Sequence, residues 1–275
     1  MFDLAALETE LAASLFAGKL HFARVTGSTN SDLVAAARIG APQGSVYFAD
    51  EQLAGRGRAN HGWVSTAGEG LYVSVLLRPQ CSASRLPLLP LASGLAAAEA
   101  IRTVSGVVID LRWPNDLLIS TPRTKSRPLV TRVGPRKVGG ILVESQSDGS
   151  AVAFAVIGIG INVHQRIFPR GLATPATSLD RASGRTISRQ ALLAALLKSL
   201  ERETSALADP AAAAAIPARV EQSSTWTRGR SVQVHGPQPC QGVTAGLDKH
   251  GFLRVRTGEG LVTVQTGGLR DEGSQ

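Results

Sequence analysis

The chain has 275 residues, 43% of them hydrophobic, and it carries a formal net charge of +8 at pH 7. This length and composition exclude a disordered protein and allow one medium domain together with a small one. The longest apolar run, residues 86–101, is interrupted by prolines, a serine and a glutamate, so no segment reaches the roughly 20 residues of a membrane span. The positive charge favours a polyanionic partner, such as nucleic acid, a nucleotide or an acidic carrier protein.

Helical and strand patterns are mixed along the chain without strict alternation. In chain order, helices are predicted over residues 3–17, 28–38, 88–103, 188–200 and 211–222. Strands are predicted over residues 21–25, 45–50, 71–77, 107–113, 117–119, 137–145 and 152–163. The last two strands flank Asp148-Gly149, a dipeptide typical of a hairpin turn.

Two connecting segments have no apolar period. Residues 51–70 are glycine-rich, and residues 120–136 contain five basic side chains, Arg123, Lys125, Arg127, Arg132 and Arg136. The second segment is either a mobile basic loop with a binding role or a merely solvated surface loop, and the sequence leaves both interpretations open.

The character of the sequence changes after Trp226. Short alternating runs predict further strands over residues 231–235, 242–248, 252–256 and 261–265, separated by glycine-containing turns. This is the pattern of a small antiparallel barrel, and it divides the chain into residues 1–223 and residues 224–275. The predicted fold class is α+β, with a mixed β-sheet flanked by helices and a small C-terminal β-barrel.

Cys81 and Cys240 are the two cysteines, and neither has a metal-binding or Cys-x-x-Cys spacing. The first residues, Met-Phe-Asp, do not form a basic segment ahead of an apolar run, so a secretory signal is not expected. We therefore expect reduced thiols and a cytoplasmic location.

The densest chemical feature is residues 55–63, which read Gly-Arg-Gly-Arg-Ala-Asn-His-Gly-Trp. Glycines let backbone amides approach a ligand, and guanidinium groups match phosphate and carboxylate. The segment is not a Walker loop, because no Gly-Lys-Ser/Thr follows, and it is not a dinucleotide fingerprint, because Asn60 replaces the third glycine. Its composition alone would also fit an RNA-binding segment.

Three further segments narrow the interpretation. Residues 112–116 read Arg-Trp-Pro-Asn-Asp, residues 137–144 read Lys-Val-Gly-Gly-Ile-Leu-Val-Glu, and residues 158–163 read Gly-Ile-Gly-Ile-Asn-Val. Each alone could be a turn, a surface lysine or a buried strand. Together with Ser-Thr-Asn at 28–30 and the 55–63 segment, they occur in the order found in the biotin–protein ligase family, which the sequence resembles over residues 26–200 and 226–270.

The resemblance implies a fold, an activity and partners. It implies a catalytic domain like those of class II synthetases and biotin–lipoate ligases, followed by a small Src-homology-3-like β-barrel. The implied reaction activates biotin with ATP to biotinyl-5′-AMP, releases pyrophosphate, and transfers biotin to a lysine of a biotin carboxyl-carrier domain of a carboxylase. Mg²⁺ is expected with ATP, although no protein ligands for a metal can be assigned, and a monomer or a homodimer is equally open.

The resemblance also implies roles for individual residues. The predicted catalytic residues are Lys137, Arg58 and Asp116. The predicted biotin-binding residues are Ser28, Thr29, Asn30, Gln52, Gly139 and Gly140. The predicted ATP- or adenylate-binding residues are Arg56, Gly57, Arg58, Lys137 and Asn162. The residue types fit the chemistry, because both reactants are anions and cations must screen their repulsion.

For several residues the sequence allows two interpretations. Asp116 could deprotonate or orient the carrier lysine, or it could cap a turn. Trp63 could touch a ligand or only pack, Arg112 could face phosphate or the surface, and Arg270 could contact the ATP site or lie on the surface.

The 55–63 segment departs from the family at Asn60 and His61, where the family has glycine and arginine. Asn60 is expected to preserve the turn, because asparagine tolerates a positive φ better than other non-glycine residues. His61 is mostly neutral at pH 7 and cannot replace a guanidinium. The hypothesis that follows is weaker binding of ATP, or compensation from residues 120–136.

Other functions would also account for parts of the sequence. A lipoate or octanoyl transferase is the nearest alternative, a nucleic-acid-binding protein would account for the charge, and a silent biotin-binding homologue is opposed by the presence of Lys137 and Arg58. Only 27 residues precede Ser28, too few for the helix-turn-helix that some family members carry. We therefore expect the monofunctional type, without specific DNA binding and without a membrane association.

Overall fold

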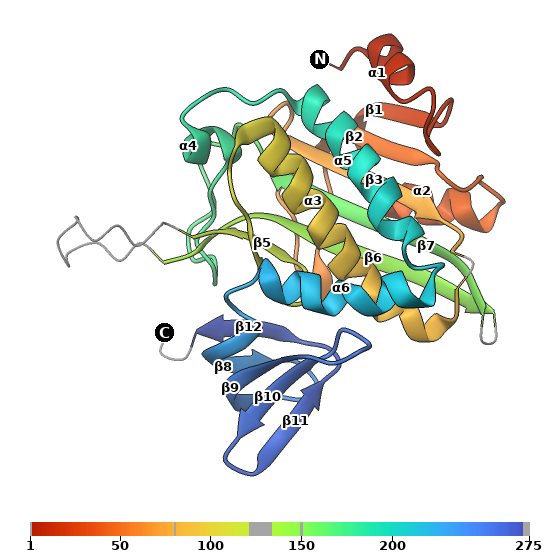
Figure 1. The fold of residues 1–275 in the computed structure, drawn as a ribbon. Coiled ribbons are helices and arrows are strands. Elements are labelled where there is room, and N and C mark those ends of the chain that lie inside the picture. Colours follow the sequence, from red (N-terminus) through yellow and green to blue (C-terminus); the bar gives the residue numbers. More distant parts are fainter. Residues whose placement is uncertain (1, 80, 121–133, 149–150, 272–275) are drawn as a thin grey trace.

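The computed structural model describes residues 2–79, 81–120, 134–148 and 151–271 (Figure 1). Most of the predicted basic loop at 120–136 lies outside the described residues. A seven-stranded sheet forms the centre of the structure, in the order β1 (Leu20–Thr26), β2 (Val46–Gln52), β3 (Gly70–Leu77), β7 (Ala151–Asn162), β6 (Arg136–Asp148), β5 (Asp116–Ile119) and β4 (Asp110–Arg112). β1 and β2 are parallel and every other neighbouring pair is antiparallel, so the sheet is mixed as predicted.

Helices cover the two faces of this sheet unequally. Val73 and Val75 of β3 belong to the large core beneath α3 (Leu89–Ser105) and α5 (Arg189–Ser205), whereas Leu76 packs on the other face with Leu33. Leu33 belongs to α2 (Thr29–Arg38), which connects the parallel strands β1 and β2. Because side chains alternate between the faces of a strand, α2 lies opposite α3 and α5 and covers less of its face.

Two glycines let other side chains lie directly on the α2 face of the sheet. Gly158 and Gly160 of β7 point toward this face, and a Cβ atom built on Gly158 would lie 2.4 Å from Asn30 Oδ1. A Cβ on Gly160 would lie 2.6 Å from the ring of Trp63. Any larger residue at either position would therefore collide with groups that lie on the sheet.

The first helix is shorter than predicted. Helix α1 ends at Glu10 rather than near residue 17, and turns follow it. The tighter path lets both Leu11 and Phe16 enter the core, with exposed fractions of 1% and 0%. Burying these two apolar side chains stabilises the fold more than continuing a regular helix would.

The other predicted helices are present, and the predicted strand at 107–113 is reduced to β4. The short helices η1 (Arg58–Asn60), η2 (Ala83–Leu88) and α4 (Leu179–Ser183) were not predicted.

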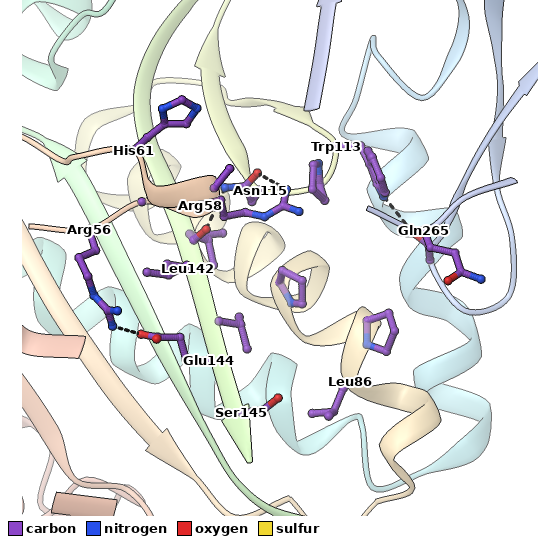
Figure 2. Close-up of a pocket in the computed structure, with 18 of the residues that line it drawn as sticks. Arg56, Arg58, His61, Leu86, Trp113, Asn115, Leu142, Glu144, Ser145 and Gln265 are labelled. Carbon is purple, nitrogen blue, oxygen red and sulfur yellow. Dashed lines mark hydrogen bonds and ion pairs between the residues drawn. The ribbon is translucent and has the colours of Figure 1, made fainter. Parts of the chain in front are cut away.

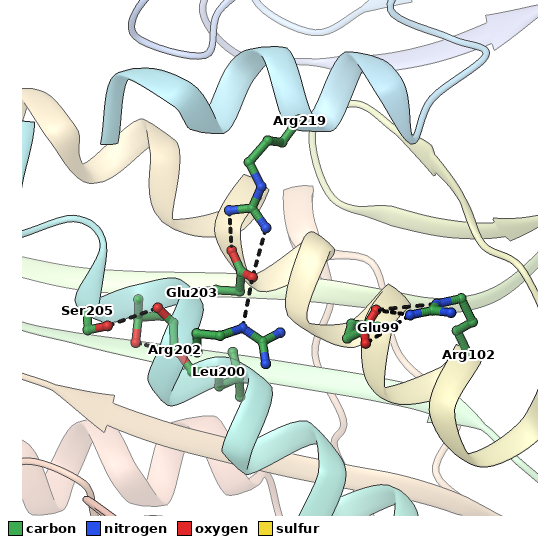
Figure 3. Close-up of polar contacts among 8 residues, drawn as sticks. Glu99, Arg102, Leu200, Arg202, Glu203, Ser205 and Arg219 are labelled. Carbon is green, nitrogen blue, oxygen red and sulfur yellow. Dashed lines mark hydrogen bonds and ion pairs between the residues drawn. The ribbon is translucent and has the colours of Figure 1, made fainter. Parts of the chain in front are cut away.

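A bidentate ion pair joins α5 to α6 (Pro210–Gln222). Glu203 of α5 is 4% exposed, and its two carboxylate oxygens accept hydrogen bonds of 2.7 and 2.9 Å from Arg219 of α6 (Figure 3). A buried carboxylate needs such a partner, because an unpaired charge is costly there. The pair therefore fixes α6, which leads to the second sheet.

The second sheet is small and antiparallel, in the order β11 (Gly260–Val264), β10 (Leu253–Thr257), β9 (Cys240–Leu247), β8 (Arg228–His235) and β12 (Gly268–Asp271). An all-β C-terminal unit is thus confirmed. This sheet is consistent with the predicted small barrel, although within the described residues no strand pair joins β11 to β12 to close it. Trp226, Val232 and Leu253 belong to the same continuous core as the first sheet. The boundary at residue 223 remains a prediction.

No helix in the described parts of the chain is both long and apolar enough to cross a membrane.

Candidate active site

A cavity of about 860 Å³ opens where the two sheets approach each other. Its lining comes from the 54–62 loop, from η2 and the start of α3, from β6, from the Trp-Pro-Asn turn at 113–115 and from loops of the second sheet. Figure 2 shows Arg56 and Arg58 on one side of this cavity and Leu86 and Gln265 on others. The segments that the sequence singled out at 55–63 and 112–116 therefore meet at one place.

The 55–63 segment closes a tight turn over the cavity. Gly57 N donates to His61 O at 2.7 Å, and His61 N donates back to Arg58 O at 3.1 Å. The residue with positive φ inside this turn is Ala59, at φ 52°, and not Asn60. The turn is thus preserved as expected, but not for the expected reason, because the two hydrogen bonds place the reversal one residue before Asn60.

Arg58 is held by groups from both sheets. Its Nη1 donates to Asn115 Oδ1 at 3.2 Å and to Gly267 O at 3.0 Å, and its Nη2 donates to Thr266 Oγ1 at 3.1 Å. Burial lowers the pKa of Arg58, and the nearby Asp116 carboxylate opposes that shift. A guanidinium stays charged at neutral pH regardless, so Arg58 is a fixed cation at the cavity.

Asp116 connects two further cations. Its Oδ2 accepts hydrogen bonds of 2.7 and 3.0 Å from Arg112, and its Oδ1 lies 2.5 Å from Lys137 Nζ. Burial alone would raise the pKa of the Asp116 carboxyl, but the charges and hydrogen bonds of Lys137 and Arg112 outweigh burial and lower it. Asp116 thus accepts hydrogen bonds from side chains and not from the backbone amides of its own turn. This argues against the interpretation of Asp116 as a turn cap. Arg112 is 7% exposed and does not lie on the surface.

This arrangement makes a pH-dependent contribution to stability. The pKa of Asp116 lies below its usual value near 3.8, so the stabilisation is complete above that pH and is lost as pH falls through the lowered pKa. We expect the free energy of unfolding of the wild type to fall below about pH 4 more steeply than that of Asp116→Asn. Urea unfolding at a series of acidic pH values measures both slopes, and equal slopes would contradict the assignment.

A bulge brings Lys137 to the site face of β6. The register slips between the pairs Leu117–Gly139 and Leu118–Lys137, so the usual alternation of faces shifts by one residue. A Cβ built on Gly140 would lie 3.5 Å from Lys137 Nζ and 3.6 Å from Trp63, and Lys137 Nζ lies 5.6 Å from the centroid of the Trp63 ring. Lys137, Gly140 and Trp63 therefore share one face, with the ring packed on glycines.

Gly139 faces the other side of the strand. A Cβ there would lie 2.8 Å from Gly160 O and 2.9 Å from Leu117. The lack of a side chain at Gly139 therefore serves packing within the sheet. Gly140 thus faces Lys137 and Trp63 whereas Gly139 does not, and a role of either glycine in keeping side chains away from biotin stays a prediction.

A buried network of neutral polar groups lies beside β6. The N and Oγ1 atoms of Thr29 donate to Gln52 Oε1 at 3.0 and 3.1 Å, and Thr29 Oγ1 also lies 2.8 Å from Ser74 Oγ. Ser74 Oγ donates to Asn30 Oδ1 at 2.8 Å, and Gln52 Nε2 donates to Ser65 Oγ at 2.8 Å. Four of the five residues are less than 6% exposed, namely Thr29, Asn30, Ser65 and Ser74. The structure thus brings three of the predicted biotin-end residues together.

Ser74 and Ser65 were missed by sequence reasoning. Ser74 is a small polar residue among the mostly apolar side chains of β3, all of whose residues are buried. A buried polar residue needs a hydrogen-bond partner, so this serine was the available signal. Ser65 lies in a loop without an apolar period, so nothing in the sequence indicated that it is buried.

Of the predicted site residues, Arg56, Gly57 and Arg58 line the cavity, and the other nine do not, namely Ser28, Thr29, Asn30, Gln52, Asp116, Lys137, Gly139, Gly140 and Asn162. Ser28 is 4% exposed and begins α2, but its side chain makes no capping hydrogen bond. Asn162 donates from Nδ2 to Thr177 O at 3.1 Å, next to the backbone hydrogen bond from Thr177 N to Lys137 O. Asn162 is not among the described residues that line the cavity. Its adenylate contact therefore stays a prediction.

The three predicted cations approach one region from different sides. Arg56 and Arg58 both line the cavity, and Lys137 adjoins it through Asp116, whose neighbour Asn115 binds Arg58. Arg56 is directed toward Glu144 on β6, where the two form an ion pair (Figure 2). Lys137 is not among the described residues that line the cavity, so the convergence of all three cations on one spot stays a prediction.

Comparison with known proteins agrees with this geometry. The Biotin/lipoate A/B protein ligase family model matches residues 22–162. The chain belongs to this family. Within the biotin/lipoate ligase family, it is 32% identical over 247 residues to a biotin–[acetyl-CoA-carboxylase] ligase of Mycobacterium tuberculosis, covering 88% of this chain and 85% of that protein. It is 32% identical over 246 residues to the bifunctional ligase/repressor BirA of Bacillus spizizenii, covering 87% of this chain and 70% of that protein.

A solved structure of a family member is also similar. The biotin protein ligase from Aquifex aeolicus, in complex with biotin and ATP, has a TM-score of 0.76 and 28% identity to this chain. The match covers 93% of this chain and 100% of that one. The ligase-like fold and the sequence motifs therefore point to the same family.

No cluster of three or more histidine, cysteine or acidic side chains that could hold a metal occurs among the residues placed by the structure. The two carboxylates near the cavity, Asp116 and Glu144, are each bound by two side-chain donors. The protein side chains thus do not fit a dedicated metal site.

Proposed function

We propose that this chain is a biotin–protein ligase, which activates biotin with ATP and transfers it to a lysine of a biotin carboxyl-carrier domain. The observation that carries the proposal is the array of Arg58, Asn115, Asp116 and Lys137 at the cavity, beside a buried network of neutral polar groups. The cationic array suits anions, and the network of neutral donors and acceptors suits an uncharged ureido ring. A single substrate with a ureido ring and a carboxylate, together with ATP, requires both.

In the first step a biotin carboxylate oxygen attacks the α-phosphorus of ATP. The bond between that phosphorus and the bridging oxygen to the β-phosphate breaks, pyrophosphate leaves, and biotinyl-5′-AMP remains. Arg58 and Lys137 neutralise charge on the reacting groups, which is most of what a protein contributes to such a transfer. Mg²⁺ would neutralise the phosphates and would be held chiefly by them and by water.

In the second step the amine of the carrier lysine attacks the acyl carbon of biotinyl-5′-AMP, an amide forms, and AMP leaves. A lysine is mostly protonated at neutral pH and must lose a proton before it attacks. Asp116 has a lowered pKa and both its oxygens are occupied, so it is a weak base. We assign it the orienting role, in which it holds Lys137 toward the reacting phosphate.

The proposal is tested by biotin-dependent exchange of radioactive pyrophosphate into ATP, followed by incubation with a carrier domain and detection by streptavidin. Both signals are expected from the wild type. Exchange that requires lipoate instead of biotin would favour a lipoate ligase, and salt-sensitive binding of RNA or DNA without exchange would favour a nucleic-acid-binding protein.

His61 gives a prediction about ATP affinity. It is exposed, lines the cavity and stands where the family has an arginine. His61→Arg should tighten ATP binding about three- to tenfold, because a permanent guanidinium adds a charge-assisted hydrogen bond. Calorimetric titration measures the affinity. Ile39→Arg adds the same charge at an 89% exposed position on α2's C-terminal end and is the control; an unchanged affinity in His61→Arg would refute the hypothesis.

A further inference from the structure

Arg112 is a buried cation to which the proposed steps give no role. It ends β4 and does not line the cavity. With 7% of its surface exposed, it is the one buried arginine or lysine among the residues that the structure describes. A guanidinium is costly to remove from water unless its partners compensate for the lost hydration. The contacts of Arg112 therefore call for an explanation.

Hydrogen bonds from Arg112 fix the orientation of the Asp116 carboxylate. The Nε and Nη2 atoms of Arg112 both donate to Asp116 Oδ2, at 3.0 and 2.7 Å, and Nη2 also donates to Thr174 Oγ1 at 2.8 Å. The other carboxylate oxygen, Oδ1, lies 2.5 Å from Lys137 Nζ. Because two donors hold Oδ2, the carboxylate does not rotate freely, and Oδ1 stays directed toward Lys137.

The second sheet contacts Arg112 through an aromatic ring. Arg112 Cζ lies 5.0 Å from the centroid of the Trp226 ring, and Arg230 Cζ lies 3.6 Å from the same centroid. Arg230 belongs to β8 and is held by both carboxylate oxygens of Asp271 on β12, at 2.6 and 2.8 Å. Trp226 is 1% exposed, and cation–π attraction is stronger at such desolvated sites. A continuous series of contacts therefore connects β12 to Arg112.

Hydrogen bonds also hold the segment that carries Trp226 against β4. Leu111 N donates to Ser223 O at 2.9 Å, and Ser224 Oγ donates to Leu111 O. Trp226 N in turn donates to Ser224 Oγ at 3.1 Å. Leu111 directly precedes Arg112, so the position of Arg112 depends on the second sheet as well as on the first.

We propose that Arg112 is a positioning residue for adenylate formation and that the second sheet, through Trp226 and Arg230, holds it in place. Arg112 keeps the Asp116 carboxylate in the orientation that directs Lys137 Nζ toward the reacting phosphate. Trp226 and Arg230 do not line the cavity, so the second sheet acts on Lys137 from a distance. The inference rests on the proposed function, because it takes Lys137 as the catalytic cation.

The first test measures biotinyl-adenylate formation by Arg112→Gln in single turnovers over a range of ATP concentrations. The maximal rate should fall about ten- to a hundredfold, because a small misplacement of a catalytic group costs that much. The half-saturating ATP concentration should change by less than about threefold, since Arg112 does not line the cavity. Circular dichroism establishes that the variant is folded.

The pH dependence of this rate separates a positioning role from a purely structural one. Burial raises the pKa of Asp116, and Lys137 and Arg112 together lower it by more than burial raises it. In Arg112→Gln the pKa of Asp116 should therefore rise, and protonation should release Lys137 as pH falls. The rate of Arg112→Gln should thus begin to fall at a higher pH than that of the wild type. Arg112→Lys keeps a cation beside Asp116 and should return this acid limb toward its wild-type position.

A matched pair of variants on β8 tests the contribution of the second sheet. Arg230 and Arg228 form ion pairs with Asp271 and Glu221, and of the two arginines it is Arg230 that contacts Trp226. Arg230→Gln should lower the maximal rate about two- to tenfold and shift the acid limb in the same direction as Arg112→Gln. Arg228→Gln should leave both unchanged. The Arg230 side chain is 26% exposed, so we expect Arg230→Gln to fold even where Arg112→Gln does not.

Four results would count against these expectations. A lower rate with an unmoved acid limb in Arg112→Gln would show a structural role and overturn the inference. A change confined to the half-saturating ATP concentration would overturn it as well. Wild-type kinetics in Arg230→Gln would overturn the part assigned to the second sheet. A wild type without biotin-dependent pyrophosphate exchange would instead refute the proposed function, on which the inference rests.

Discussion

Lys137→Ala is expected to lower the rate of biotinyl-adenylate formation by about a hundredfold or more, since one preorganised donor to developing charge is worth that much. Lys137 lies 2.5 Å from Asp116 and over Gly140, where nothing else among the described residues supplies an ammonium. The folded state should survive, because Asp116 keeps its two hydrogen bonds from Arg112. Single-turnover kinetics with ATP and biotin measure the rate.

The matched control for this variant is Lys198→Ala. Lys198 is half-exposed and pairs with Glu10 on the far helical layer, so its loss should leave the rate unchanged. A rate for Lys137→Ala within tenfold of the wild type would remove Lys137 from the chemistry and leave Arg58 as the main cation.

Trp226→Ala is expected to reduce the free energy of unfolding by about 3–5 kcal/mol, the usual cost of truncating a buried tryptophan. Trp226 is 1% exposed and lies between two guanidinium groups, with Arg230 at 3.6 Å and Arg112 at 5.0 Å from the ring centroid. The variant loses apolar burial and two cation–π contacts together. Unfolding in urea, followed by fluorescence and by circular dichroism, measures the change.

Leu261→Ala is the control for the second sheet, because Leu261 is 56% exposed and its truncation should change stability by less than about 0.5 kcal/mol. A loss below about 1 kcal/mol in Trp226→Ala would contradict the view that this side chain joins the two sheets. Because Arg112 also binds Asp116, the variant should further reduce the rate of adenylate formation when folded.

The sequence was most informative where motifs of chemically suited residues occur in the chain order of the family. The motifs at 55–63, 112–116 and 137–144 predicted that Arg58, Asp116 and Lys137 would meet, and these residues lie in one connected array. The alternation of strands and the positions of α3, α5 and α6 also followed from the sequence pattern, although α5 extends to Ser205 beyond its predicted end at residue 200.

Features that depend on distant contacts could not be predicted. The bulge in β6 decides that Lys137 shares a face with Gly140, and a regular strand would place the two on opposite faces. The end of α1 depends on where Leu11 and Phe16 find room in the core. The acceptors that Arg58 finds in Thr266 and Gly267 lie more than 200 residues further along the chain and carry no local signal.

Those acceptors have a consequence for biosynthesis. Arg58 leaves the ribosome long before Thr266 and Gly267 are made, so a growing polypeptide can pair the strands of its first sheet while this guanidinium still lacks two of its three anchors. The proposed nucleotide-binding surface is therefore finished only when translation has reached β12, and an incomplete chain should bind ATP weakly even where its larger sheet has already formed.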